Sequence, residues 1–231
     1  MNKKNIEVLI LAGGHGTRLA SVVNDVPKPM APVKGKPFLE HLINFIKNQG
    51  FKNFRLLTGF KSDIIQNHFR DGSHLGIDIK YTTENSPLGT GGALKLAIRD
   101  SKFKKFLVFN GDSFFDVDLT LFLDKVPGDF SIALKYFQNC ERYGQVVVDN
   151  NFIIKSFVEK GDNPNNGFIN AGIYFFSKKI LNYFINEESF SIEKEIMPKL
   201  SRSGLLTGIP LEGNFIDIGT PEDYIKVQNY F

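Results

Sequence analysis

Short apolar runs recur through the first half of the chain, and segments with helical spacing separate them. The runs cover residues 8–12, 54–60, 77–84 and 105–112. A continuous apolar run is typical of a strand that is covered on both faces. Helices are predicted at residues 38–48, closed by Gly50, at 62–68, capped by Ser62, and at 90–99. This alternation predicts a mostly parallel sheet with helices on both faces.

The alternation of strand and helix signals ends after Asp129. Four strand-like runs follow at residues 130–137, 144–149, 152–160 and 170–177, with few helical signals between them. They predict an antiparallel or mixed addition to the sheet. Helices are predicted at 179–185 and 192–200, a last strand at 214–218, and a final helix that Thr220 caps and Pro221 opens. No repeat or linker divides the chain, so we expect one α/β domain spanning residues 1–231, Rossmann-like, with a mixed, mostly parallel sheet.

Composition narrows the class of protein. With 231 residues and 42% hydrophobic content, the chain can bury a full core. The net charge of +3 is mild and its basic residues are scattered, so no nucleic-acid partner is predicted. No stretch approaches the roughly 20 apolar residues of a membrane span, and the first apolar run is too short for a secretion signal. The single cysteine, Cys140, excludes an internal disulfide framework. We expect a cytoplasmic protein without a membrane partner, and the Phe-rich run at 175–177 suits a homodimer contact.

The stretch LILAGGHGTRL, residues 9–19, joins the first strand to a glycine-rich loop. It matches neither the G-x-x-x-x-G-K-[ST] loop nor the G-x-G-x-x-G fingerprint. Glycines still let an anion or a base edge approach the backbone N–H groups, and Arg18 can fork onto phosphate oxygens. Because ligands bind beyond the carboxyl ends of the strands in open α/β sheets, this loop is a candidate binding site. Taken alone, it is equally compatible with a glycine-rich turn beside a surface arginine.

Three charged residues are further candidates for a binding site. Lys28 lies between Pro27 and Pro29, which predicts a stiff, extended backbone that presents the ammonium group at a fixed place. Asp112 follows the fourth strand, and Asp217 alternates with isoleucines at a late strand end. Mg²⁺ takes one or two carboxylates together with phosphate oxygens, so this pair is a candidate magnesium site. The nearby Asp116 and Asp118 are interpreted as a turn residue and a helix cap.

Together these segments resemble the sugar-1-phosphate nucleotidyltransferase family over nearly the whole chain. The resemblance implies catalytic roles for Arg18 and Lys28 and a catalytic magnesium on Asp112 and Asp217. It places the nucleotide mainly in residues 1–128 and the sugar phosphate mainly in residues 129–231. The implied nucleotide-binding residues are Leu11, Ala12, Gly13, Gly14, Gly16, Thr17, Glu84, Pro87, Gly89, Thr90 and Gly111. The implied sugar-phosphate residues are Arg142, Gly144, Glu159, Lys160 and Asn170.

The segment TENSPLGTGGAL, residues 83–94, bears on the nucleobase. Guanine presents N–H donors and needs an acceptor, which Glu84 can supply; the alternative is that Glu84 is an exposed acid at a strand end. The segment resembles guanylyl-transferring members of the family and some cytidylyl- or uridylyl-transferring members. Its combination with the short chain and the NGD motif is most similar to members that transfer a guanylyl group to D-glycero-α-D-manno-heptose 1-phosphate in surface-glycan synthesis. The expected reaction joins GTP and that sugar phosphate to give an NDP-sugar and pyrophosphate. Alternatives are mannose 1-phosphate or another acceptor with GTP, CTP or UTP, and a non-catalytic regulatory subunit that binds a nucleotide-sugar. Many relatives carry a C-terminal β-helix, and this sequence shows none.

Overall fold

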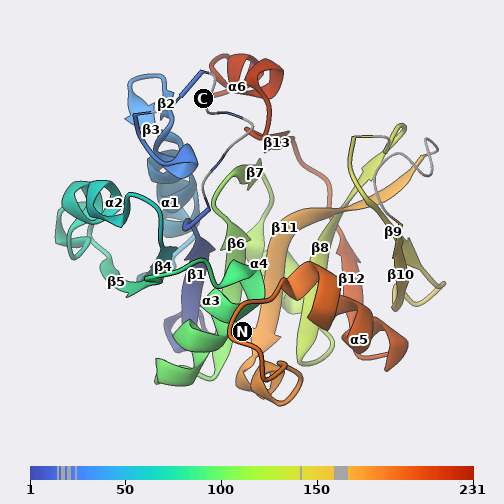
Figure 1. Cartoon of the computed structure of the whole chain (residues 1–231). Helices are drawn as coiled ribbons and strands as arrows, with labels where there is room; N and C mark the ends of the chain where they lie inside the picture. Colours follow the sequence, from blue (N-terminus) through green and yellow to red (C-terminus); the bar gives the residue numbers. More distant parts are fainter. Residues whose placement is uncertain (15, 17–18, 20–21, 24, 141, 159–165) are drawn as a thin grey trace.

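A computed structural model of the chain describes residues 1–14, 16, 19, 22–23, 25–140, 142–158 and 166–231. Four parallel strands form one half of the central sheet in the spatial order β6-β1-β4-β5 (Figure 1). They are β1 (Ile6–Leu11), β4 (Asn53–Thr58), β5 (Asp78–Thr83) and β6 (Lys105–Asn110). The four early strands predicted from the sequence are therefore confirmed, with bounds that differ by one or two residues.

The second half of the sheet is mixed, as predicted from the series of strand-like runs after Asp129. The long strand β11 (Gly167–Ser177) pairs antiparallel with β6, with β8 and with β9. On its outer side lie β8 (Phe130–Phe137), β9 (Gln145–Val148), β10 (Ile154–Val158) and β12 (Thr207–Pro210). β12 pairs parallel with β8, and the sequence analysis missed it.

Helices cover both faces of the sheet, and each face has its own core. Side chains alternate along the strands, so Val8 and Ile10 join one core while Leu9 joins the other. The first core is covered by α1 (Phe38–Asn48), α2 (Ser62–Phe69), α4 (Leu119–Lys125) and α6 (Pro221–Val227). The second is covered by α3 (Gly89–Asp100), η4 (Lys178–Asn182), η5 (Ile192–Ile196) and α5 (Met197–Arg202). Strands buried on both faces explain why the apolar runs are continuous. No described helix has the length and apolar character needed to span a bilayer.

A small two-stranded sheet brings two distant segments together at the carboxyl edge of the main sheet. It pairs β7 (Ser113–Phe115) with β13 (Phe215–Asp217), antiparallel, with Asp217 opposite Ser113. The backbone N–H of Ile218 also donates to the carbonyl of Asp112 at 3.0 Å. Asp112 and Asp217 therefore lie beside each other, although more than a hundred residues separate them in the sequence.

A short helix and a hairpin lie beside this edge. A hairpin of β2 (Pro32–Val33) and β3 (Lys36–Pro37) follows the 3-10 helix η2 (Lys28–Met30). Two further 3-10 helices, η1 (Lys3–Asn5) and η3 (Ser73–Leu75), lie elsewhere on the chain. Thr220 caps α6 by accepting from the N–H of Asp223, and Asp118 caps α4, as predicted.

Three local predictions are wrong. Ser62 is the first helical residue of α2 and not its cap, because Lys61 in a left-handed conformation (φ +51°) turns the chain into the helix. Lys28 is not in an extended segment: it opens η2, where Met30 N–H donates to the carbonyl of Pro27. The Phe-rich residues 175–177 cannot form a dimer contact, because they are buried within β11 between β6 and β8.

Candidate functional site

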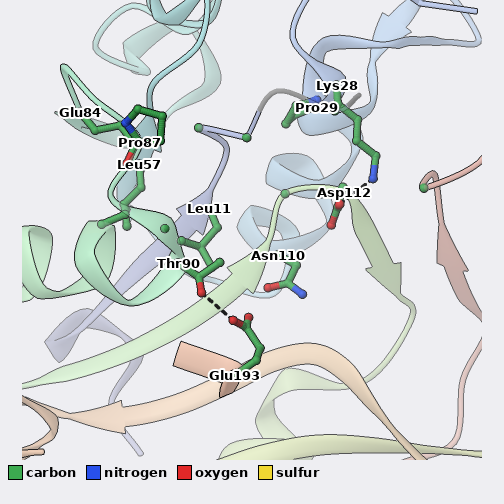
Figure 2. Close-up of a pocket in the computed structure, with 17 residues that line it drawn as sticks. Leu11, Lys28, Pro29, Leu57, Glu84, Pro87, Thr90, Asn110, Asp112 and Glu193 are labelled. Atoms are coloured by element: carbon green, nitrogen blue, oxygen red, sulfur yellow. Dashed lines mark hydrogen bonds and ion pairs between the residues drawn. The ribbon is translucent and has the colours of Figure 1, made fainter. Parts of the chain in front are cut away.

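A cavity of about 410 Å³ opens at the carboxyl ends of β1, β4 and β6 (Figure 2). In Figure 2, Glu84, Pro87 and Leu57 lie at one side, and Lys28 and Asp112 lie at the other. Thr90 lies between these two sides, with Glu193 below it and Asn110 beside it, toward Asp112. The lining residues are Leu11, Gly13, Gly14, Gly16, Lys28, Pro29, Leu57, Glu84, Pro87, Gly89, Thr90, Ala93, Asn110, Gly111, Asp112, Glu193 and Gly219.

Glycines allow neighbouring backbone segments to approach each other closely in the wall of this cavity. A Cβ on Gly13 would lie 2.9 Å from Oε1 of Glu84, and a Cβ on Gly111 would lie 2.4 Å from the carbonyl oxygen of Leu11. The second approach is closer than any real Cβ contact and involves backbone, so Gly111 cannot be replaced without moving β1. Close packing at these two positions, rather than turn geometry alone, explains why glycine occurs there.

Glu84 is more than an exposed acid at a strand end. It is partly buried, and its Oε2 accepts a hydrogen bond from the N–H of Leu88 at 3.0 Å, which shapes the turn leading into α3. The carboxylate thus faces the cavity from a backbone-anchored position, close to Gly13 and Gly59. The exposed-acid alternative for Glu84 does not fit this placement.

Lys28, Asp112 and Asp217 form the charged side of the site. The Nζ of Lys28 donates to Oδ2 of Asp112 at 2.6 Å and lies 4.0 Å from Oδ1 of Asp217. Lys28 is only 9% exposed, so its charge needs these partners. Two acids from distant segments therefore converge on one cation at the edge of the cavity.

Asp217 retains an unsatisfied oxygen. Its Oδ1 is buried and receives no hydrogen bond from a described residue, and the ammonium group of Lys28 is too far away to donate one. Burial raises the pKa of Asp217 above its usual value, and the nearby charge of Asp112 raises it further, while Lys28 and a backbone hydrogen bond from Gly219 to the carboxylate lower it. A buried carboxylate oxygen without a donor, next to a second carboxylate, has the electrostatics of a cation-binding position.

A second cavity, of about 400 Å³, lies on the other side of Asp217. Arg142 makes two hydrogen bonds to the carboxylate of Asp223 there, and Lys226 lies 3.8 Å from the same carboxylate. Burial raises the pKa of Asp223, but the hydrogen bonds from Arg142 and Thr220 outweigh it and hold that pKa below its usual value. Tyr143 and Phe215 also line this cavity, so both cationic and aromatic side chains face it.

The residues implied by the family resemblance are placed as follows. Lys28, Asp112 and all the implied nucleotide residues except Ala12 and Thr17 line the first cavity, and Arg142 and Asp217 line the second. Ala12 is instead buried in the core, where its N–H donates to the carbonyl of Leu57. Gly144 and Asn170 line neither cavity. Thr17, Arg18, Glu159 and Lys160 lie outside the described residues.

Asn170 belongs to a hydrogen-bonded chain under the first cavity. Its Nδ2 donates to the hydroxyl of Tyr174 at 3.1 Å, and that hydroxyl lies 3.4 Å from Oδ1 of Asn110. Tyr174 is fully buried, and burial keeps its pKa far above the usual value, so the hydroxyl remains a neutral donor. Asn170 is thus connected to the first cavity through Tyr174 and Asn110 and does not line it.

Sequence reasoning missed Asn110 and Glu193 as cavity residues. Glu193 lies on η5, and its Oε2 accepts from the hydroxyls of Thr90 at 2.6 Å and Ser191 at 2.7 Å. No sequence signal marks this contact, because Thr90 and Glu193 are 103 positions apart.

Comparison with known proteins gives one consistent result. The family model described as nucleotidyl transferase matches residues 7–231. The chain is 42% identical to a D-glycero-alpha-D-manno-heptose 1-phosphate guanylyltransferase from Campylobacter jejuni subsp. jejuni serotype O:2 over 95% of this chain and 97% of that protein. It is 39% identical to the protein of the same name from Aneurinibacillus thermoaerophilus, over 96% and 97% of the two chains.

The fold has a solved counterpart. HddC from Yersinia pseudotuberculosis, in its complex with GMP-PN, superimposes with a TM-score of 0.87 at 38% identity, over 97% of this chain and 99% of that chain. The match extends across both the parallel and the mixed halves of the sheet. On its matched residues and its architecture, this chain belongs to the nucleotidyl transferase family.

Proposed function

We propose that this protein transfers a guanylyl group from GTP to D-glycero-α-D-manno-heptose 1-phosphate, releasing pyrophosphate and forming the GDP-sugar. The observation that carries the proposal is the convergence of Asp112 and Asp217 on the Nζ of Lys28, at the edge of a glycine-walled cavity. The similarity to two heptose 1-phosphate guanylyltransferases over nearly the full chain supports the choice of base and sugar. A cytoplasmic location, where GTP is made, and a role in surface-glycan synthesis are part of the proposal.

The residues present fit a magnesium ion. The orphaned Oδ1 of Asp217 and the carboxylate of Asp112 supply two oxygen ligands, and phosphate oxygens of the substrates complete the set that Mg²⁺ prefers. No group of three or more acidic, His or Cys side chains suited to a metal occurs in the described part of the chain, in keeping with a site that the substrates complete. When bound, the ion neutralises phosphate charge and lets two anions approach.

The reaction itself needs little covalent chemistry from the protein. A phosphate oxygen of the sugar 1-phosphate attacks the α-phosphorus of GTP, and the bond from that phosphorus to the bridging α–β oxygen breaks. The electron pair leaves with pyrophosphate, and the attacking oxygen is already ionised, so no base is required. The protein must align two anions and stabilise the charge that develops.

Among the described residues, we assign the stabilisation of the developing charge to Lys28. Its ammonium group lies among Asp112 and Asp217 in the free protein, close to where the α-phosphoryl group must lie if those acids hold the metal. We assign Arg18 to the leaving pyrophosphate and Lys160 to the sugar phosphate, from the family resemblance. Arg142, with Gly144 and Glu159, belongs to the sugar-phosphate side, and its cavity adjoins Asp217.

The base lies at the opposite side of the cavity in this proposal. Glu84 presents an acceptor there beside Pro87 and Leu57, and guanine is the base that offers two adjacent N–H donors to a carboxylate. The GMP-PN complex of HddC supports binding of a guanine nucleotide by this fold. Residues 1–128 then serve mainly the nucleotide and residues 129–231 mainly the sugar phosphate.

The experiment that tests the proposal is a substrate matrix. The purified protein is incubated with Mg²⁺, each of GTP, CTP, UTP, dTTP and ATP, and each of heptose, mannose and glucose 1-phosphates, and pyrophosphate release is followed. We expect the highest kcat/KM for GTP with the heptose 1-phosphate. A higher value for mannose 1-phosphate would replace the acceptor, and release with no pair at all would support a binding subunit instead.

A further inference from the structure

Glu193 is an acidic side chain in the wall of the first cavity. It lines the first cavity from η5, below Thr90 and opposite Asn110 (Figure 2). The phosphate-binding groups Lys28 and Asp112 and the base-side group Glu84 lie at other parts of the same cavity. None of the reaction steps described above uses Glu193.

Its carboxylate is held in one orientation. Both short hydrogen bonds, from Thr90 and from Ser191, end on Oε2, and the Thr90 hydroxyl in turn accepts from the N–H of Ile192 at 2.9 Å. Each donor therefore belongs to a network that spans α3 and η5. A side chain fixed in this way presents its second oxygen, Oε1, at a constant place.

Two properties of Oε1 indicate its ligand. Within the described ranges, no residue donates a hydrogen bond to it, and no Lys or Arg forms an ion pair with Glu193. An unneutralised carboxylate repels phosphate but accepts readily from neutral hydroxyl donors.

The neighbouring Asn110 completes the pattern. Its Oδ1 faces the hydroxyl of Tyr174, and among the described residues none accepts a hydrogen bond from its Nδ2. The pair therefore offers an acceptor on Glu193 and a donor on Asn110, and a sugar hydroxyl is both a donor and an acceptor. The chain through Tyr174 reaches Asn170, on the half of the protein to which we assign the sugar phosphate.

We infer that Glu193 reads hydroxyl groups on the ring of the acceptor sugar and helps to determine which sugar 1-phosphate is accepted. The inference rests on the proposed function, since it assigns a substrate contact in the same site. Ribose hydroxyls of GTP have the same chemistry, but they lie between the base and the triphosphate. Glu193 reaches the cavity from the second half of the chain, outside the line from Glu84 to Asp112.

The test compares Glu193→Gln with a matched control. Glu195→Gln removes the same charge two positions further on, at an exposed residue outside the cavity. KM and kcat are measured for GTP and for the sugar 1-phosphate, together with mono-deoxy analogues of the sugar and with 2′- and 3′-deoxy-GTP. We expect Glu193→Gln to raise KM for the sugar 1-phosphate about 10-fold or more, because a hydrogen bond to a charged group is lost. KM for GTP should stay within about twofold, and Glu195→Gln should match wild type.

The deoxy sugars give the sharper readout. Wild type should discriminate against at least one of them about 10-fold or more, and Glu193→Gln should lose that discrimination. An unchanged preference in the variant, an equal rise of both KM values, or a change confined to the deoxy-GTP series would overturn the inference while leaving the proposed function intact. Absence of turnover by wild type would overturn both.

A second variant tests the inference if Glu193→Gln does not fold. Ser191→Ala keeps the charge of Glu193 but removes one of the two hydroxyls that orient it. We expect a smaller rise in the same KM, about 2- to 10-fold. Thermal stability should fall only modestly, because the same hydroxyl also caps η5 by accepting from the N–H of Lys194 at 3.2 Å. If Glu193→Gln fails to fold, this variant decides, and a KM for the sugar 1-phosphate equal to wild type overturns the inference.

Discussion

Asp217 shows at the scale of one residue how a binding site works against stability. Its Oδ1 is buried without a donor, and its pKa is raised by burial and by Asp112. When the pKa of an acid is higher in the folded than in the unfolded protein, protonation favours folding, so ionisation of Asp217 above its unfolded pKa destabilises the free protein at neutral pH. Binding of a cation beside this carboxylate would offset that cost.

Asp217→Asn should therefore stabilise the free enzyme and inactivate it. We expect a higher Tm than wild type in metal-free buffer at pH 7, a smaller difference at pH 4, where Asp217 takes up a proton, and turnover lower by about 10²–10³-fold. Thermal unfolding at both pH values and steady-state turnover check this. A lower Tm at pH 7 would mean that Asp217 stabilises the fold through its charge, contrary to the electrostatics described above.

At the scale of elements, the site depends on how α6 holds the β2–β3 hairpin. Tyr224 and Gln228 of the α6 region both donate to the carbonyl of Pro32, and Lys34 N–H donates to Oε1 of Gln228 at 3.3 Å. The hairpin follows Lys28 by only a few residues, and α6 follows Asp217 by only a few. These bonds thus connect the two segments that meet at the ion pair.

Gln228→Ala removes two of those bonds from a partly exposed position. We expect a loss of about 1 kcal/mol in the free energy of unfolding and a several-fold decrease in kcat, because Lys28 is held less firmly. Asn229→Ala, an exposed neighbour whose side chain makes no described contact with the hairpin, is the control and should match wild type. Denaturant unfolding and kcat measure the two effects, and equal behaviour of both variants would remove the proposed connection.

The same scale shows what the sequence could reveal. α1 and β8 were predicted with their correct bounds, since amphipathic spacing and a flanked apolar run are local signals. β12 was missed because Thr207–Pro210 is short, contains Gly208 and Pro210, and exists through parallel pairing with a strand far away in sequence. Likewise, Asp112 and Asp217 were visible as acids at strand ends, whereas Glu193 becomes a cavity residue only through its contact with Thr90.

At the scale of the whole molecule, two halves of one sheet supply different parts of one site. The parallel strands present the glycine loop, Glu84 and Asp112, and the second half brings Asp217, Arg142 and Glu193 to the same edge. The β7–β13 pairing joins these halves beside Asp112 and Asp217, the proposed metal ligands. Since neither half holds both acids, the proposed metal site would require the complete sheet.

The most direct measurement is the stoichiometry of Mn²⁺ binding in the presence of the α,β-methylene analogue of GTP, in which the scissile bond cannot break. Wild type should bind one ion more per chain than the analogue alone binds. Asp112→Asn and Asp217→Asn should each lose that ion and show about 10²–10³-fold lower turnover with Mg²⁺. Retention of the ion and of near-normal turnover by either variant would contradict the account.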